Sequence, residues 1–433
     1  SAFTIFFKKI PQFRLRRYFI ATLFGFFNVE RGTWNVERLL PLVLPHDLGN
    51  NICMDPYLTN DLKDIETAVR EFCAKEMEQE HLHELEDRHA YPRELYGKIG
   101  ELGIIGAGFS EDVGGSGYGA MGHVAAVTEL CRNLPGMGMA LSLGYIPGFV
   151  IDTYGNAAQR EKYIRPVVEG RYVSAISVTE PDAGSDLGSV KTRLEEKDDH
   201  YLVNGSKVFT TNAGYADFYT LMGRDGDGLS LIIIDKEAMA SNGPGHFEIN
   251  DLGRKMGINT TTSGELVFSD FRVPKENILG KRGKGLRMVL DGFELGRIVI
   301  AAQAFGTMLY GYERAVSHAR KRKQFGKPII RFQAVEHDLV GMYVEIEKCR
   351  NILYKAAWLY DKKDPESKKY SSMVKLTIPE NAIDILNRAV DILGGYGYMR
   401  DQGLEGALRD VRITSIYEGT GNIQKNAIAR MLF

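Results

Sequence analysis

The chain has 433 residues, a length that corresponds to roughly three domains of about 150 residues each. Its 54 Lys and Arg residues nearly balance its 56 Asp and Glu residues, and a formal charge of −2 argues against a nucleic-acid-binding protein, which needs a basic surface. With 44% hydrophobic and 25% charged residues, the composition is that of an ordinary globular protein.

The first 53 residues differ from the rest of the chain in charge. Residues 1–53 carry a net charge of +4, and the remainder carries −6. Their uncharged run 18–29 has 12 residues, too few to cross a bilayer that needs about 20. The segment is either an organelle presequence or membrane-surface helix, or an appended extension ahead of a protein that begins near Met54. We favour the extension, because helical periodicity begins only at Leu58. That interpretation predicts a cytoplasmic protein, whereas a presequence would predict the mitochondrial matrix.

Helical patterns dominate the next part of the chain, up to about Arg165. Apolar residues recur at three- and four-residue steps from Leu58 to Phe72, which predicts an amphipathic helix. Pro92 is placed to begin another helix and Gly103 to end it. The uncharged run 133–151 is interrupted by prolines and glycines, so it predicts a buried helix pair or pocket wall rather than a membrane span.

Between about Tyr172 and Pro274, the sequence pattern changes to short runs of β-branched and aromatic residues that are separated by Gly, Asn and Asp. This predicts a β domain, in which Val-Asn-Gly-Ser at 203–206 is typical of a tight turn. Long helical patterns return after Lys281, with an apolar stripe along 332–356 and a charged loop at 360–370. The chain thus predicts two helical domains around a β domain.

Two generic motifs carry little weight. The stretch GGSGYGAMG (114–122) contains G-x-G-x-x-G, but FSEDV precedes it, which is typical of a loop rather than the strand a dinucleotide fold requires. Three histidines at 81–89 lack the partners of a metal site, so we interpret them as exposed side chains. Four cysteines are spread too widely for a Cys-x-x-Cys pair, and we interpret them as reduced thiols of an intracellular protein. They are Cys53, Cys73, Cys131 and Cys349.

Four stretches in order carry a more specific signal. They are VTEPDAGSD (178–186), KVFTTNAG (207–214), RKQFGKPI (322–329) and IYEGTGNIQ (416–424), with GGYGY (394–398) between the last two. With these motifs, the chain from about residue 54 to 433 resembles the acyl-CoA dehydrogenase family.

The resemblance implies an α+β multidomain fold with an N-terminal α-helical domain (54–171), a middle β-barrel or sandwich domain (172–280) and a C-terminal four-helix bundle (281–433). It also implies an FAD-dependent enzyme of acyl-CoA metabolism or β-oxidation that converts an acyl-CoA to a trans-2-enoyl-CoA. Hydride would pass to flavin N5, and the electrons would leave to an electron-transfer flavoprotein.

Removal of a weakly acidic Cα proton together with a Cβ hydride needs a positioned carboxylate base and a hydride acceptor. Glu418 lies among uncharged neighbours in SIYEGTGN, where desolvation would raise its pKa toward the operating range. The resemblance implies that it is the α-proton base. Some relatives carry the base at the position of Gly296, and the glycine there supports Glu418. Glu294 is a carboxylate that mutation must exclude.

The resemblance also implies the cofactor contacts. The flavin and pyrophosphate would face the backbone from Ile176 to Thr179 and the Ser185 hydroxyl, and Phe209 and Thr211 would flank the ring. The backbone stretch includes Val178. Three further FAD positions reach the FAD of a neighbouring subunit, namely Arg322, Phe325 and Gln333. Asp391, Gly394 and Gly395 would approach the adenosine, and Thr420 and Asn422 complete the set on the last motif. This set implies at least a homodimer, or a homotetramer.

For the substrate, the resemblance places Ser185, Glu294 and Arg297 along the CoA moiety and Gly419 at the thioester. The thioester carbonyl would be polarised by the Glu418 backbone N–H and a flavin ribityl hydroxyl. A glutaryl-type substrate is disfavoured, because glycine stands at the position of a carboxylate-binding Arg.

Three alternatives remain. An acyl-CoA oxidase is disfavoured by the modest length, since such relatives commonly carry a further domain. A non-catalytic flavin or CoA scaffold is disfavoured by Glu418. A DNA-binding relative is disfavoured by the acidic charge of the core. Acyl chain length, branching and ring content are not predicted.

Overall fold

The computed structural model describes residues 27–28, 33–34, 57, 59–76 and 79–433. Of the basic segment 1–53, the structure describes only a short antiparallel pairing of strands β1 (Phe27–Asn28) and β2 (Thr33–Trp34). The other predictions for this segment, and the one for Cys53, lie outside the described residues. The side chains of His81 and His83 also lie outside. The chain divides into two units, 1–58 and 59–433, and only the second is described further.

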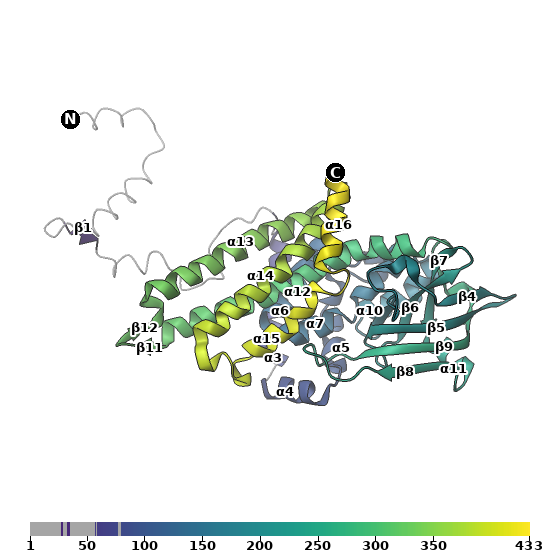
Figure 1. Ribbon diagram of the computed structural model, residues 1–433, viewed down its shortest axis with the longest axis horizontal. Coiled ribbons are helices and arrows are strands. Elements are labelled where there is room, and N and C mark those ends of the chain that lie inside the picture. The colour runs from purple at the N-terminus through teal and green to yellow at the C-terminus, as the bar shows by residue number, and fades with distance from the viewer. Residues whose placement is uncertain (1–26, 29–32, 35–56, 58, 77–78) are drawn as a thin grey trace, which may run out of the picture. The chain divides into compact units, whose positions relative to one another are not determined.

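Helices fill the first part of the second unit (Figure 1). They are α3 (Asn60–Glu76), α4 (Gln79–Arg88), α5 (Arg93–Glu101), α6 (Gly119–Asn133), α7 (Pro135–Ser142), α8 (Phe149–Tyr154), α9 (Ala157–Gln159) and α10 (Arg165–Val168). The predicted helices at 58–72 and after Pro92 are α3 and α5, so both predictions are confirmed. The run 133–151 forms the buried α7 and the start of α8, as predicted.

A mostly antiparallel sheet of eight strands follows, in the order β10-β7-β6-β4-β5-β9-β8, with β3 parallel to β6. The strands are β3 (Ser174–Ser177), β4 (Arg193–Glu196), β5 (His200–Thr211), β6 (Phe218–Asp225), β7 (Gly228–Asp235), β8 (Phe247–Asp251), β9 (Ser263–Pro274) and β10 (Ile278–Leu279), with helix α11 (Lys236–Asn242) after β7. Apolar side chains of β5, β6, β7 and β9 pack into one core, which confirms the predicted β domain.

The tight turn predicted at 203–206 is wrong. The stretch lies inside strand β5, where the pairing with β9 shifts register between Val203 and Gly205. Gly205 has φ 141°, and a Cβ there would lie 2.7 Å from the Thr192 Cα. Gly205 therefore permits a register shift within the strand and the close approach of the Thr192 backbone. Pairing with the distant β9 overrides the local preference of this stretch for a turn.

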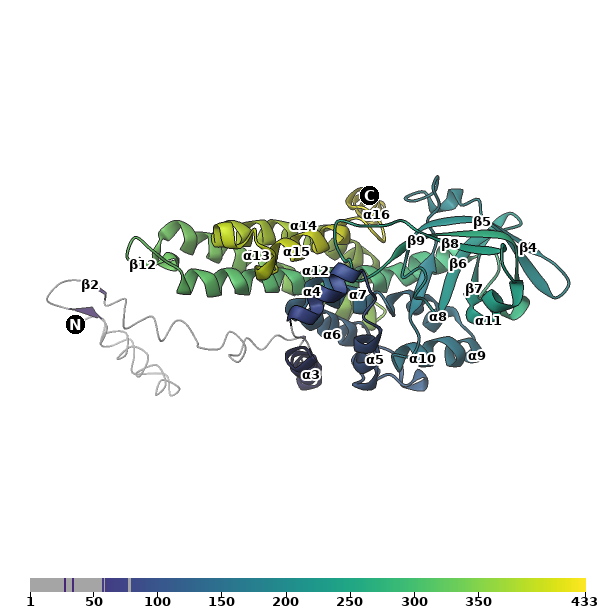
Figure 2. The ribbon, with the colours of Figure 1, turned by 90° about the horizontal axis from the view of Figure 1, so that it is seen from below.

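Long helices form the last part: α12 (Gly285–Lys321), α13 (Gln333–Asp361), α14 (Ser367–Leu393), α15 (Leu404–Val411) and α16 (Gly421–Leu432). Figures 1 and 2 show α12, α13 and α14 running side by side, with the hairpin β11 (Lys323–Gln324) and β12 (Lys327–Pro328) at the end remote from the large sheet. The predicted stripe is buried on α13 from Leu339 onward. Helix α12 is buried along most of its length because α6, α13 and α14 all pack on it.

The Gly-rich stretch before α6 holds a protein carboxylate. Asp361, at the end of α13, accepts hydrogen bonds from the Ala120 and Met121 backbone N–H groups at 2.7 and 3.1 Å. A Cβ at Gly119 would come within 2.8 Å of the Asp361 carboxyl carbon. The glycine thus permits a carboxylate to cap the helix N-terminus.

Substitution of Asp361 by Ala should lower the free energy of unfolding by about 1 kcal/mol, because two N-terminal N–H groups of α6 lose their acceptor. Thermal unfolding checks this result. The exposed neighbour Lys362 is the matched control, and equal melting temperatures for Asp361→Ala and Lys362→Ala would contradict the capping role.

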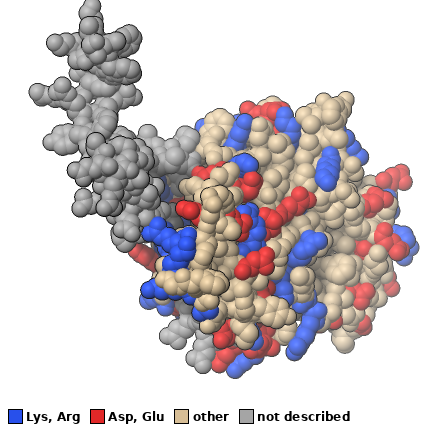
Figure 3. Space-filling view, turned by 60° about the vertical axis from the view of Figure 1, so that its left-hand side comes forward, with Lys and Arg blue, Asp and Glu red and all other residues tan. Residues whose placement is uncertain are grey.

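The cysteines, the helices, the metal-ligand types and the surface charges can each be compared with the predictions. The described cysteines Cys73, Cys131 and Cys349 are free and buried, as expected for reduced thiols. Among the described residues, no helix is both long and apolar enough to cross a membrane, and no cluster of three or more His, Cys, Asp or Glu side chains could hold a metal. On the face in Figure 3, basic and acidic side chains are interspersed rather than gathered into a basic patch.

Candidate active site

Glu418 lies in a strained turn between the short helix η10 (Arg412–Ser415) and α16. Its φ is 51°, in the left-handed region that a glutamate rarely adopts, and the φ of Gly419 is 104°. The turn directs the carboxyl group onto Gly296 of α12. A Cβ at position 296 would overlap Oε2, and would lie 2.8 Å from Oε1 and 2.9 Å from Cδ. The missing side chain of Gly296 is therefore the space that the Glu418 carboxyl occupies.

The Glu418 carboxyl is buried although the residue as a whole remains partly exposed. Its Oε2 has no hydrogen-bond partner within the described residues. Burial raises the pKa of Glu418 to about 7, and the charges of Lys375 and Arg297 oppose this rise. A carboxyl group with a pKa near neutrality and a buried oxygen that accepts no hydrogen bond is suited to accept a proton.

Two cations face this carboxylate from different helices. Lys375 of α14 is 2% exposed, and its Nζ donates a hydrogen bond to the Gly419 carbonyl at 3.2 Å. Burial lowers the pKa of Lys375 to about 8. Arg297 of α12 has a buried Nε without a hydrogen-bond partner among the described residues, and burial lowers its pKa as well.

Sequence reasoning missed Lys375. The available signal was a single lysine within an otherwise uncharged stretch, SSMVKLTIP (371–379), whose neighbours Val374 and Ile378 are buried. Sequence reasoning did single out Arg297, as a contact of the CoA moiety. In the structure, the Arg297 guanidinium is largely buried and faces the carboxylates of Glu418 and Glu294.

Side chains on both sides hold the turn. Gln424 Nε2, in the first turns of α16, donates to the carbonyls of Glu418 at 3.3 Å and Gly419 at 3.0 Å. Tyr417 donates from its hydroxyl to Gln303 of α12, and Gln303 Nε2 donates to the Ser142 hydroxyl at 2.7 Å. The residues before and after Glu418 are thereby anchored to the core, which supports the strained backbone between them.

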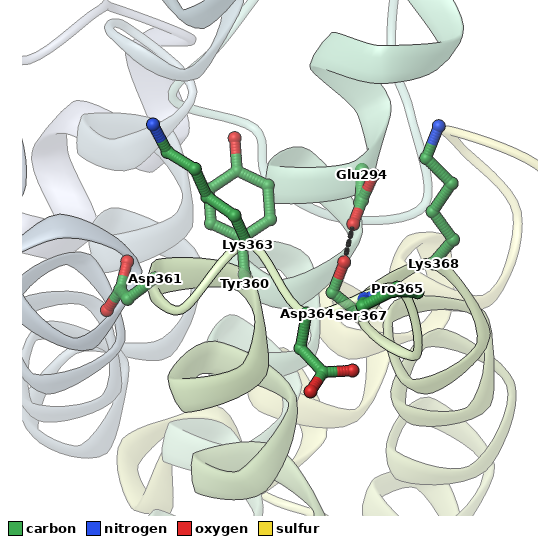
Figure 4. A pocket seen from close by; sticks show the side chains of 8 residues that line it. All are labelled: Glu294, Tyr360, Asp361, Lys363, Asp364, Pro365, Ser367 and Lys368. Carbon is green, nitrogen blue, oxygen red and sulfur yellow. Dashed lines mark hydrogen bonds between the residues drawn. The ribbon is translucent and has the colours of Figure 1, made fainter.

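Glu294 belongs to a neighbouring pocket of about 420 Å³ between α12 and the α13–α14 connection. Figure 4 shows its carboxyl pointing toward Ser367, whose hydroxyl donates to it. The remaining lining residues are Tyr360, Asp361, Lys363, Asp364, Pro365 and Lys368. Because the Glu294 carboxylate already accepts a hydrogen bond, it is less suited than Glu418 to act as the base.

The residues predicted near the flavin ring meet on β3 and β5. The Val208 N–H donates to the Thr179 carbonyl at 2.9 Å, which brings the stretch 176–179, with Val178 buried, beside Phe209 and Thr211. Phe209 is 69% exposed and has a left-handed φ of 57°. Ser185 lies exposed in the following loop.

Groups on this face fit a flavin. Phe209 presents an apolar ring, and the neighbouring Asn212 has a buried Oδ1 without a hydrogen-bond partner in the described part of the chain. A flat ring system would cover the exposed Phe209 ring, whereas Asn212 is buried beneath this face. Thr420 and Asn422 lie within four residues of Glu418, at the start of α16.

The other predicted FAD residues lie elsewhere. Arg322, Gly394 and Gly395 line a second pocket, of about 500 Å³, with Gln324, Leu393, Tyr396 and Met399. Phe325, at the tip of the hairpin, is 93% exposed, and Gln333 and Asp391 are exposed too. On α12, Arg297 and the Arg322 that follows the helix are separated by roughly 37 Å at 1.5 Å per residue. The predicted FAD residues therefore form two separate groups in one chain.

Comparison with known proteins gives three adjacent family matches. Residues 59–171 match the model "Acyl-CoA dehydrogenase, N-terminal domain", residues 175–271 the middle domain and residues 283–433 the C-terminal domain.

Two curated relatives and two solved structures illustrate the similarity. The chain is 35% identical over 386 residues to "Acyl-CoA dehydrogenase, short-chain specific" of Clostridium acetobutylicum, covering 88% of this chain and 100% of the relative. It is 33% identical to "Caffeyl-CoA reductase-Etf complex subunit CarC" of Acetobacterium woodii, covering 87% and 99%.

Among solved structures, butyryl-CoA dehydrogenase from Megasphaera elsdenii matches with a TM-score of 0.81 and 35% identity, covering 87% of this chain and 98% of that one. The FAD complex of PigA matches with a TM-score of 0.80 and 27% identity, again covering 87% and 98%.

Proposed function

The chain belongs to the acyl-CoA dehydrogenase family, and from this premise we propose that it is an FAD-dependent enzyme that converts an acyl-CoA thioester to a trans-2-enoyl-CoA, with Glu418 as the base. The observation that carries the proposal is the buried Glu418 carboxyl, which lies against Gly296 with its Oε2 free of hydrogen bonds and has a pKa of about 7. We propose the domain limits 54–171, 172–280 and 281–433, which the ranges of the three family matches support.

In the proposed reaction, the Glu418 carboxylate takes the proton from Cα of the substrate. FAD, when bound, supplies the acceptor for the hydride of Cβ, so one C–H bond breaks at each carbon and a C=C bond forms. Tyr417 and Gln424 keep the base turn in place during the transfer, and the buried setting limits competition from water. The Glu418 backbone N–H polarises the thioester carbonyl beside Gly419.

We place the CoA moiety along Ser185, Glu294 and Arg297. Support comes from the pocket beside Glu294, where Lys363 and Lys368 offer flexible cations for phosphate groups. At position 138 a Cβ would lie 2.8 Å from the Cys131 backbone nitrogen, so this glycine has no space for the Arg of glutaryl-type relatives.

A complete cofactor site requires a second copy of the chain. The residues around Phe209 and Glu418 would hold the flavin, and the group containing Arg322, Gly394 and Gly395 would reach the FAD of the neighbouring copy. Arg297, which faces Glu418, lies roughly 37 Å along α12 from Arg322, and this separation supports the division. We propose a homodimer or a homotetramer.

The electron partner we propose is an electron-transfer flavoprotein, which the CarC relative supports, since its name includes an Etf complex. The same name favours a second candidate function, reduction of a 2-enoyl-CoA. That reaction would use the same residues, with Glu418 delivering the proton to Cα.

Anaerobic mixing of the FAD-loaded enzyme with saturated acyl-CoAs of graded length, branching and ring content tests the proposal. At least one member should bleach the flavin, and the product should be the trans-2-enoyl-CoA. Reoxidation of the photoreduced enzyme by 2-enoyl-CoAs, compared with the rate of bleaching, separates the two directions. Failure of both reactions across the panel would contradict the proposed function.

The rate of flavin reduction should depend on pH through Glu418. Only the ionised carboxylate accepts a proton, and its pKa is raised to about 7. The rate should therefore rise between about pH 6 and pH 8, with its midpoint near 7, and should be low in acid. A stopped-flow pH profile checks this, and a midpoint near the ordinary glutamate pKa of about 4.3 would contradict it.

A further inference from the structure

We propose that Lys375 is a positioning residue for the base: it holds the Glu418–Gly419 turn by a hydrogen bond and keeps the carboxylate ionised by its charge. The inference rests on the proposed function of Glu418 and goes beyond it, because it assigns a role to a side chain on another helix.

Two buried side chains, Lys375 and Gln424, hold the Glu418–Gly419 turn by hydrogen bonds. The Gly419 carbonyl accepts from Lys375 Nζ at 3.2 Å and from Gln424 Nε2 at 3.0 Å, and Gln424 also reaches the Glu418 carbonyl at 3.3 Å. Both donors are buried. A backbone with φ values of 51° and 104° in consecutive residues is maintained only by such contacts.

The charges of Lys375 and Arg297 both act on the Glu418 carboxylate. The charged groups that face Glu418 are Lys375 from α14 and Arg297 from α12, and those that face Lys375 are Glu418 and Arg297. Arg297 is shared with a second carboxylate, Glu294. Among the described residues, Glu418 is the only carboxylate that faces Lys375, so without Lys375 the base would depend on Arg297, which two carboxylates share.

Burial of the Lys375 ammonium group costs desolvation free energy, which its interactions must offset. A lysine that is 2% exposed gives up its hydration, and its ammonium group gains one carbonyl acceptor at hydrogen-bond distance and, from beyond ion-pair distance, the charge of the Glu418 carboxylate. The Tyr417 ring lies 6.0 Å from Nζ, at the outer limit of a cation–π contact. Lys375 therefore stabilises the turn and the base, and it does not form a surface ion pair.

Three single variants separate the two effects. Lys375→Met, which preserves volume and apolar burial, removes both the donor and the charge. Lys375→Gln removes the charge but retains an N–H donor, and it provides a second test if the Met variant does not fold. Gln424→Leu removes the other donor to the same carbonyl and leaves the charge. Thermal unfolding and FAD content of each variant establish that it is folded.

The pH profile of anaerobic flavin reduction distinguishes these variants. Loss of the Lys375 charge should raise the midpoint by about one pH unit in both lysine variants, which lowers the rate at pH 7 about fivefold. Lys375→Met should remain slower than Lys375→Gln above the midpoint, because only the former lacks a donor. Gln424→Leu should slow the reaction at every pH without moving the midpoint.

A second readout does not need turnover. In the holoenzyme labelled with ¹³C at the glutamate side-chain carboxyl, the NMR signal that disappears in Glu418→Gln should titrate near pH 7, and about one unit higher in Lys375→Met and Lys375→Gln. An unchanged titration in both lysine variants overturns the inference. If no acyl-CoA reduces the wild-type flavin, the proposed function fails, and this titration still decides the role of Lys375.

Discussion

Replacement of Glu418 by Gln is expected to slow anaerobic flavin reduction by acyl-CoA on the order of 10²- to 10⁴-fold, while the enzyme still binds FAD and acyl-CoA. The amide has the same shape as the carboxyl and fits against Gly296, so the fold and the strained turn are preserved. It cannot accept the Cα proton. Stopped-flow absorbance of the flavin measures the rate, and equilibrium titration measures acyl-CoA binding.

Glu294→Gln is the matched control. Glu294 is also a buried carboxyl on the approach to the site, but it already accepts a hydrogen bond from Ser367. We expect this variant to weaken binding of the CoA moiety and to retain the rate at saturating substrate. The reverse pattern, a full rate in Glu418→Gln and a loss in Glu294→Gln, would exchange the roles of the two residues.

Introduction of a single methyl group at Gly296 is expected to reduce the rate about 10²-fold. The new Cβ would overlap Oε2 of Glu418, so the carboxylate would have to move by a distance comparable to the 1 Å displacement that costs this factor. Helix α12 is otherwise undisturbed, since Ala is a better helix former than Gly. Flavin reduction in Gly296→Ala, at saturating acyl-CoA, measures the effect.

Gly97→Ala controls for a glycine-to-alanine change within a helix. Gly97 lies on α5, and a Cβ there meets no atom within 4 Å, so activity should be unchanged. If Gly296→Ala also retains the wild-type rate, the Glu418 carboxyl does not occupy the space beside α12 during catalysis.

The order of domains could be predicted because it depends on local patterns. Three- and four-residue periodicity marked α3 and α13, and the change to β-branched runs marked the sheet. The turn predicted at 203–206 does not form, because Val-Asn-Gly-Ser has the composition of a turn but its conformation is decided by pairing with β9, about 60 residues later in the chain.

The proposed base, Glu418, could be predicted from its motif, but its surroundings could not. Glu418 stands in a recognisable stretch, and the absence of a side chain at 296 was noted, but only packing brings the two together. Lys375 precedes Glu418 by 43 residues and is one of 54 cationic residues. Its uncharged neighbours at 371–379 indicate burial, but nothing in its own helix shows that it lies against the turn. Arg297 likewise faces two carboxylates, an arrangement that sequence spacing alone does not reveal.

In the proposed reaction, Glu418 removes a proton from Cα of a bound acyl-CoA. The most direct measurement of this step is the exchange of the Cα hydrogen with solvent deuterium under anaerobic conditions, followed by mass spectrometry of the recovered acyl-CoA. The wild-type enzyme should introduce deuterium at Cα, and Glu418→Gln should not, although it binds the same acyl-CoA. Equal deuterium incorporation by the two proteins would contradict the claim.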